Sequence, residues 1–213
     1  NPDEAYEAEF TAEKDIGIAC SVYSAEDFEA GDFRSKPALN AGEEVLYRGW
    51  MLNPQQYASL EAAVENTGAR MITSRDQYQR CHHLPGWYEQ CCEVTPKTIF
   101  LSEKDDFEVA VSPLAWEKYF VKDFVKSLTT SRGSVAATPQ EIGEIVRLIC
   151  KYRGAIEGGI CIREFEDLLH ATEERYFVFR GKPYSAAGAV PDIVTYVASR
   201  IDSPFYSVDV VQN

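Results

Sequence analysis

A strongly marked helix with a strand on either side dominates the second half of the chain. The stretch from Thr138 to Glu141 combines a capping threonine, a proline in the first turn and a glutamate three positions after the cap, which predicts a helix start. Apolar residues then repeat at helical spacing, at Ile142, Ile145, Val146 and Ile149. We expect strands at Tyr119–Val125 and Gly159–Phe165. Helices that pack on sheets are therefore the expected architecture.

The rest of the chain alternates in the same way. In the front part we expect strands at 16–23, 44–48 and 70–73, and helices after Asn53, at 75–81 and at 86–92. Further on we expect strands at 98–101, 107–111, 174–179 and 205–211, a helical turn at 113–117, a hairpin return at 184–187 and a helix at 190–201. The pattern changes near Val94, so we expect a small α/β domain at 1–93 and a second domain at 94–213.

Composition limits the partners. The 213 residues carry a net charge of −13 with a pI near 4.7, which argues against nucleic acid or an anionic membrane as the main partner. Any anion site must therefore be local. No apolar run approaches the roughly 20 residues that a membrane helix needs, and the first residues lack a signal segment, so we expect a cytoplasmic protein. The missing initiator methionine suggests that the chain begins inside a longer one.

The cysteines do not form a recognisable framework. Six of them are spread irregularly, which favours free thiols over disulfides. Cys81, His82 and His83 with Cys91 and Cys92 could supply soft metal ligands, but zinc sites usually place their cysteines two to four residues apart. Partly buried helix residues are the simpler interpretation.

Lys122 is the leading candidate for anion binding. In an extended strand it shares a face with Phe120 and Phe124, so its stem can lie along the rings and its ammonium can reach a phosphate. A solvated lysine on an edge strand is the alternative. The following loop is rich in hydroxyl groups and contains Arg132 and Gly133, so its donors could fold over phosphate oxygens, although a solvent loop would look similar.

Charged residues at the later strands suggest further contacts. Glu164 and Phe165 end a strand whose edge could meet a purine. Arg175 opens the next strand and suits an acyl phosphate or a carboxylate, with a surface ion pair as the alternative. Asp209, between two valines, should not be buried without a cation or a donor. In the front part Arg48 lies at the end of an expected strand and either holds an acidic acceptor or stacks on a tryptophan.

The order of these segments resembles the ATP-grasp superfamily. The stretches LYRGWM (46–51), HLPGWY (83–88) and FVKDFVK (120–126) look like a small branch found in bacteria and their phages, and the likeness runs from about Ile16 to Val211. It implies an α+β, ATP-grasp fold of two lobes that clasp a nucleotide, preceded by a small α/β domain. The lobes would span about 94–165 and 166–213.

The resemblance also implies residue roles and a reaction. Mg²⁺ and ATP would phosphorylate a carboxylate of a small molecule or a peptide, and an amine or similar nucleophile would displace the phosphate. Arg175 would be a catalytic residue that steadies the transferred phosphoryl group, and Asp209 would be a magnesium ligand. Arg48, from its place at a strand end, is the second candidate for a catalytic role. The residues assigned to the nucleotide would be Lys122, Ser131, Arg132, Gly133, Ser134, Glu164 and Phe165.

This chain departs from the superfamily pattern in two respects. Related ligases carry a further strand with more metal ligands soon after the aspartate, whereas this chain ends at Asn213, so we expect a C-terminal strand to be missing and the metal site to be incomplete. The covering loop is also poor in glycine. A catalytically inactive nucleotide-binding or assembly module is therefore the main alternative to a ligase. A kinase-like phosphotransferase is less well supported, because no base that would activate a hydroxyl is evident.

Overall fold

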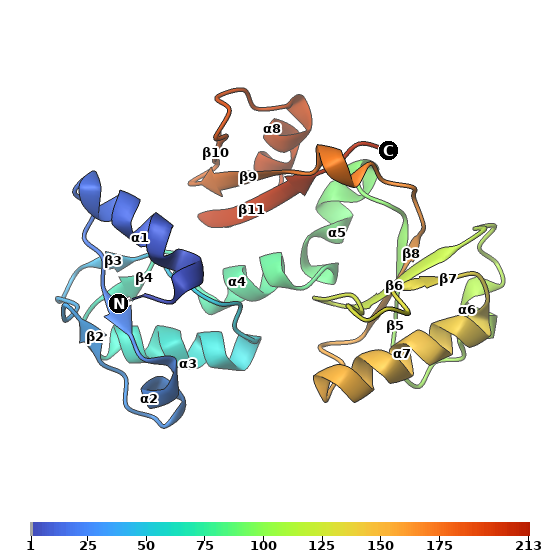
Figure 1. The fold of residues 1–213 in the computed structure, drawn as a ribbon, viewed down its shortest axis with the longest axis horizontal. Helices are drawn as coiled ribbons and strands as arrows, with labels where there is room; N and C mark the ends of the chain where they lie inside the picture. The colour runs from blue at the N-terminus through green and yellow to red at the C-terminus, as the bar shows by residue number, and fades with distance from the viewer. Residues whose placement is uncertain (1) are drawn as a thin grey trace. The chain divides into compact units, whose positions relative to one another are not determined.

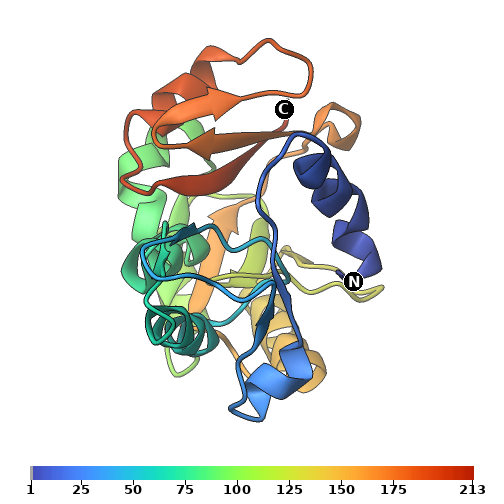
Figure 2. The same ribbon diagram turned by 90° about the vertical axis from the view of Figure 1, so that its left-hand side faces the viewer.

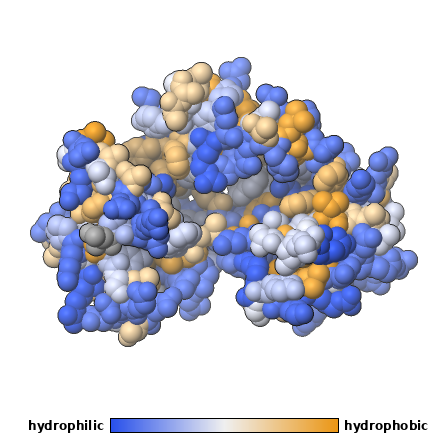
Figure 3. Space-filling model, in the orientation of Figure 1, coloured by the Kyte–Doolittle hydropathy of each residue, from blue (hydrophilic) through white to orange (hydrophobic). Residues whose placement is uncertain are grey.

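The computed structural model describes residues 2–213 and has an α+β architecture (Figure 1). The chain divides into two compact units, Asn1–Tyr78 and Gln79–Asn213, and the division falls within helix α4 (Arg75–His82). The domain boundary suggested by the sequence at residues 93–94 stays a prediction. No helix in residues 2–213 has both the length and the apolar character needed to cross a membrane. The surface seen in Figure 3 is largely hydrophilic, in keeping with the high net charge.

Helix α3 (Pro54–Glu65) supplies the apolar face of the first unit. The Asn53 side chain accepts a hydrogen bond from the Gln56 N–H at 2.8 Å, and the Gln56 side chain accepts one from the Asn53 N–H at 3.0 Å. This reciprocal cap confirms the predicted helix start. Leu60 and Val64 are buried on one side of the helix, as the spacing predicts.

The strands of the first unit are shorter than predicted. Its other elements are α1 (Glu4–Asp15), β1 (Val22–Tyr23), α2 (Ala25–Glu29), β2 (Ser35–Lys36), β3 (Glu44–Val45) and β4 (Arg70–Met71). Strands β1 and β2 pair antiparallel, and β3 and β4 pair parallel. Residues 16–21 do not form the expected strand, because Ile16 and Ile18 are 75% and 51% exposed and anchor no sheet. Helix α1 was not predicted.

The second unit contains two sheets. Its elements are α5 (Pro85–Cys91), η1 (Cys92–Val94), β5 (Thr98–Leu101), α6 (Phe107–Val111), β6 (Tyr119–Asp123), β7 (Val135–Ala136), α7 (Pro139–Arg153), β8 (Ile160–Glu164), η2 (His170–Thr172), β9 (Glu174–Phe179), β10 (Lys182–Tyr184), α8 (Asp192–Ala198) and β11 (Phe205–Val210). One antiparallel sheet has the order β5-β8-β6-β7 and the other the order β10-β9-β11.

Helix α7 covers one face of the four-stranded sheet. Thr138 caps it by accepting a hydrogen bond from the Glu141 N–H at 3.3 Å, as predicted. The Glu141 side chain accepts the Ala137 N–H at 2.7 Å, so the return bond goes to the residue before the cap. The isoleucines of the helix are buried against Val121, Ile160 and Ile162 of the strands. This core leaves the opposite face of the sheet for other contacts.

Residues Phe107–Val111, predicted as a strand, form helix α6 instead. The Asp106 side chain accepts hydrogen bonds from the N–H groups of Glu108 and Val109, at 3.0 and 3.2 Å. This side-chain cap begins a helix, so the local cap overrides the apolar run on which the strand prediction depended. The helical turn predicted at 113–117 is also wrong, since no helix spans these residues.

The three-stranded sheet packs one face on helix α8 (Figure 2). Val178 and Tyr206 are buried there together with Ala198. Because side chains alternate along a strand, the neighbouring residues Arg175 and Asp209 lie on the other face. The predicted strands at 174–179 and 205–211 are confirmed, the second one residue shorter. The hairpin forms, but its returning strand is Lys182–Tyr184 and not the predicted 184–187, because the turn is tighter and leaves Lys182 and Pro183 paired with Phe179 and Val178.

Candidate functional site

The face of the four-stranded sheet opposite helix α7 brings two cations together. In the strand register Lys122 lies opposite Cys161, and Phe120 lies opposite Arg163. Strand β5 pairs on the other side of β8, where Phe100 lies opposite Cys161. Since Val121 and Ile162 point into the core, the residues beside them point away from it. We call this surface the cationic face; its members are Phe100, Phe120, Lys122, Cys161 and Arg163.

Lys122 is half-buried on the cationic face. Burial lowers its pKa, and the positive charge of Arg163 lowers the pKa further. None of the ion pairs found within residues 2–213 includes Lys122 or Arg163. A desolvated cation outside these ion pairs is suited to binding an anion from outside the chain.

Aromatic rings border the cationic face beside strand β5. The Phe100 ring packs edge to face on Tyr88 at 5.4 Å and on Phe124 at 6.0 Å. Tyr88 belongs to α5, and its hydroxyl oxygen accepts a hydrogen bond from the Thr98 N–H at 2.8 Å. The predicted grouping of Lys122 with phenylalanine side chains on one face is thus in keeping with the register.

Glu164 and Phe165 lie differently from the sequence interpretation. Glu164 is opposite Tyr119, which packs in the α7 core, so its side chain is on the other side of the strand from Lys122. It forms an ion pair with Lys97 at 3.2 Å. The Phe165 N–H donates to the Lys118 carbonyl at 3.1 Å. The structure therefore brings Arg163, rather than the Glu164 side chain, beside Lys122, and a nucleotide-lining role for 164–165 stays a prediction.

Several polar groups of the predicted covering loop form hydrogen bonds or ion pairs within the loop or with helix α7. Ser134 is buried, and its hydroxyl oxygen accepts a hydrogen bond from the Leu128 N–H at 2.7 Å. Arg132 donates to the Val135 carbonyl at 2.8 Å and lies 3.6 Å from carboxylate oxygens of the α7 helix. Ser131 is exposed, and Gly133 has a positive φ of 67°. Contacts of this loop with phosphate remain a prediction, to which Ser131 and Gly133 are better suited than Ser134.

Arg175 and Asp209 bind one another. They are directly opposite in the β9–β11 pair, and two hydrogen bonds of 2.6 and 2.8 Å join the guanidinium to the carboxylate. The Asp209 hydrogen bond raises the pKa of Arg175. Asp209 is exposed, and Arg175 is the hydrogen-bond donor that an aspartate between two valines was expected to need. Within residues 2–213 no three histidine, cysteine or acidic side chains form a group that could hold a metal. The magnesium role of Asp209 remains a prediction.

Arg48 lies in the first unit. Its guanidinium binds the carboxylate of Glu9 in helix α1 through contacts of 2.5 and 3.0 Å. The Trp50 ring packs edge to face on Tyr6 at 5.6 Å. An acceptor-binding role for Arg48 remains a prediction, because a Glu9 carboxylate already occupies part of its fork.

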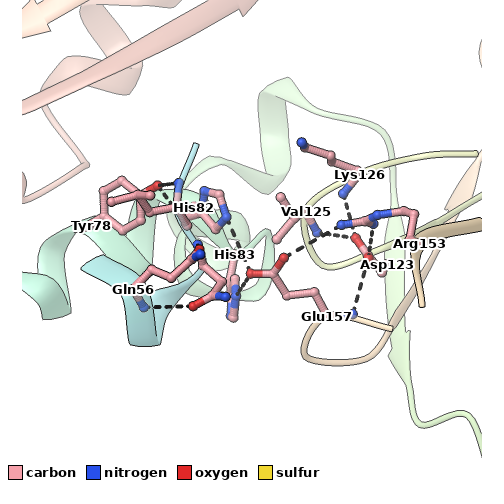
Figure 4. Close-up of polar contacts among 11 residues, drawn as sticks. Gln56, Tyr78, His82, His83, Asp123, Val125, Lys126, Arg153 and Glu157 are labelled. Atoms are coloured by element: carbon pink, nitrogen blue, oxygen red, sulfur yellow. Dashed lines mark hydrogen bonds and ion pairs between the residues drawn. The ribbon is translucent and has the colours of Figure 1, made fainter. Parts of the chain in front are cut away.

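A buried charge cluster that the sequence analysis missed lies at the end of strand β6 (Figure 4). Asp123 is fully buried, forms an ion pair with Arg153 and accepts the N–H groups of Val125, Lys126 and Glu157 at 2.8, 2.6 and 3.2 Å. A buried carboxylate with this many donors is a structural anchor. The signal was present in the sequence, since Asp123 alternates with Tyr119 and Val121 on the core face of the strand.

Two histidines extend this cluster. The Nε2 atoms of His82 and His83 lie 3.5 and 3.3 Å from Glu157 Oε1, and an Arg153 nitrogen lies 3.7 Å from the other Glu157 oxygen. Burial lowers the pKa of His82 below its usual 6.5, although Glu157 acts in the opposite direction; the charges of His83 and Lys126 lower it further, and Asp123 raises it. His82 is therefore mostly neutral in the folded protein near neutral pH.

Acidification is expected to destabilise the fold through His82. The unfolded histidine takes up a proton near pH 6.5, whereas the folded one does so at lower pH. The unfolded state then binds more protons, so the free energy of unfolding falls as pH drops below about 6.5. Between about pH 7.5 and pH 5.5, the free energy of unfolding measured in urea should fall less for His82→Gln than for the wild type. The exposed His170→Gln is the control, and equal losses in all three proteins would refute the role of His82.

Comparison with solved structures identifies the fold. No protein-family model and no curated protein matches the sequence. D-alanyl-alanine synthetase A from Vibrio cholerae has a TM-score of 0.58 at 11% identity, covering 96% of this chain and 78% of that one. The ATP complex of D-alanine–D-alanine ligase from Bacillus anthracis has a TM-score of 0.55 at 13% sequence identity, and the match covers 88% of this chain and 67% of the ligase. A RimK domain ATP-grasp protein from Sphaerobacter thermophilus has a TM-score of 0.55 at 15% sequence identity, and the match covers 80% of this chain and 68% of that protein.

These likenesses show the fold alone. The predicted α+β chain with an ATP-grasp fold is confirmed. When this chain is compared with another structure of the Bacillus anthracis ligase, the match covers 64% of the ligase, which is less than two thirds of the ligase's length.

Proposed function

We propose that the protein is an ATP- and Mg²⁺-dependent ligase of the ATP-grasp type that joins a carboxylate to an amine or a similar nucleophile. The observation that carries the proposal is the cationic face, where Lys122 is half-buried beside Arg163 on a sheet of this fold. In a chain with a net charge of −13, such a local positive site favours a compact polyanion. A nucleoside triphosphate has this chemistry.

The proposed reaction has two balanced steps. A carboxylate oxygen of the acceptor attacks the γ-phosphorus of ATP, the bond to the β-phosphate oxygen breaks, and ADP leaves with that electron pair. The nucleophile then attacks the acyl carbon, releases inorganic phosphate and loses a proton. Lys122 would hold phosphate oxygens by charge-assisted hydrogen bonds, and Arg175 would steady the transferred phosphoryl group.

Magnesium would offset negative charge on the phosphates, with Asp209 as the carboxylate that this chain would contribute. Asp209 is the one proposed ligand, and it is held by Arg175. Within residues 2–213 no three histidine, cysteine or acidic side chains gather around a common metal position. The roles of Lys122 and Arg175 therefore do not depend on a metal position in this chain.

The wider assignment follows from the same proposal. The acceptor is a carboxylate of a small molecule or a peptide. The protein acts in the bacterial cytoplasm, and either a bacterium or one of its phages encodes it. Its structural neighbours carry names such as D-alanine–D-alanine ligase and D-cycloserine synthetase, which supports small carboxylates as the first class to screen.

Product release tests the activity. Incubation with ATP, MgCl₂ and panels of carboxylates and amines should release ADP and phosphate only when a suitable pair is present, and mass spectrometry should find the condensed product. Phosphate transfer that needs no amine would indicate a phosphotransferase instead. ATP binding without turnover on any pair would support the inactive binding module. Absence of ATP binding would contradict the proposal altogether.

A further inference from the structure

Arg163 has an unused hydrogen-bond donor on the cationic face. An Nη2–H donates to the Thr95 hydroxyl at 2.6 Å, which fixes the guanidinium. Its Nε–H is buried and has no acceptor within the described part of the chain. A buried donor without a partner costs on the order of 1–3 kcal/mol, so such a group calls for a bound water or ligand that accepts its hydrogen bond. An acceptor supplied from outside these residues would satisfy it.

The position of Arg163 relative to Lys122 indicates the kind of acceptor. Arg163 lies opposite Phe120, two positions from the strand pair of Lys122 and Cys161, so the two cations are diagonal neighbours on one face. Diagonal neighbours on adjacent strands are about 7–8 Å apart at their Cα atoms, within joint reach of these long side chains. One anion with several oxygens can contact both.

The surroundings strengthen this preference for an anion. Burial lowers the pKa of Arg163 as well as that of Lys122. The thiol of Cys161, opposite Lys122, does not offset their charges, because burial raises the pKa of Cys161 to about 12 and keeps it protonated. Phenylalanine rings flank the pair, and a low dielectric makes each contact with an anion stronger than in water.

From this geometry we propose that Arg163 is a second phosphate-binding residue, which with Lys122 grips the polyphosphate of the nucleotide from the sheet side, and that Thr95 positions it. The proposal rests on the proposed function for the identity of the ligand. The Arg163 Nε–H and the Lys122 ammonium donate to oxygens of the same chain of phosphates, a pairing to which a guanidinium fork is well matched.

Titration calorimetry with ATP, tripolyphosphate and adenosine tests this role. Arg163→Met should weaken binding of both ATP and tripolyphosphate by tenfold or more. Arg163→Lys keeps the charge but lacks the Nε–H, and should give a smaller loss. Thr95→Val, which removes the positioning hydroxyl at similar volume, should also weaken both ligands. The control Arg147→Met removes an exposed arginine on α7 and should change neither affinity.

The outcomes separate this inference from the proposed function. Tripolyphosphate affinity equal to that of the wild type in Arg163→Met would overturn the inference, and loss of ATP binding alone would assign Arg163 to the base instead. Should Arg163→Met fail to fold, Arg163→Lys and Thr95→Val decide by the same comparison. Phosphate binding that depends on Arg163 without ligase turnover would uphold the inference and reject the ligase.

Discussion

Replacing Lys122 with alanine is expected to weaken ATP binding by about 10- to 100-fold while leaving the fold intact. The estimate corresponds to one charge-assisted hydrogen bond, worth about 1.5–3 kcal/mol. The fold should tolerate the change because none of the ion pairs within residues 2–213 depends on the lysine and because the substitution relieves its repulsion with Arg163. Calorimetric titration with ATP measures the loss, and a urea unfolding curve checks the fold.

Lys126→Ala is the matched control for this experiment. Lys126 follows in the same segment and is exposed, so its removal changes the net charge equally without touching the cationic face. Its affinity for ATP should stay within about twofold of the wild type, because exposed charges act weakly at physiological ionic strength. Equal affinities of Lys122→Ala and the wild type would remove Lys122 from the phosphate site.

Replacing Asp123 with alanine is expected to lower the free energy of unfolding by about 3–5 kcal/mol. Its carboxylate is fully buried, pairs with Arg153 and accepts N–H groups of the turn after β6, including those of Val125 and Lys126. Alanine leaves the arginine without its buried partner and leaves the N–H donors unsatisfied, which is far more costly than losing a surface ion pair.

Denaturant unfolding of Asp123→Ala measures this loss. Asp167→Ala is the control, since Asp167 is exposed, and it should change stability by less than about 0.5 kcal/mol. Asp123→Asn keeps an acceptor for the turn but loses the charge, so we expect an intermediate value. A loss below about 1 kcal/mol for the alanine variant would contradict the anchoring role of Asp123.

The helices with both caps and spacing were predictable from sequence. Helices α3 and α7 are capped by Asn53 and Thr138 as expected, because side-chain caps act within a few residues. Short strands were less predictable. The strand expected at 16–23 shrinks to Val22–Tyr23, since the pairing that defines a strand depends on a distant partner, Ser35–Lys36. Helix α6 was predicted as a strand because residues 107–111 are mostly apolar, whereas the cap that starts the helix is a single residue, Asp106, just before them.

The candidate site was predictable in part. Strand alternation placed Lys122 on a face with aromatic rings. That Arg163 shares this face and Glu164 does not depends on the pairing of β6 with β8, which the sequence does not specify. The pairing of Arg175 with Asp209 depends on the register between β9 and β11, which the sequence does not specify. The roles of Arg48 and of residues 131–134 stay predictions.

A crystal structure of the protein with a non-hydrolysable ATP analogue and MgCl₂ tests the central claim most directly. We predict phosphate oxygens within about 3 Å of Lys122 Nζ and of Arg163 Nε. Ordered density for the analogue at another place, with both side chains unliganded, would contradict the account.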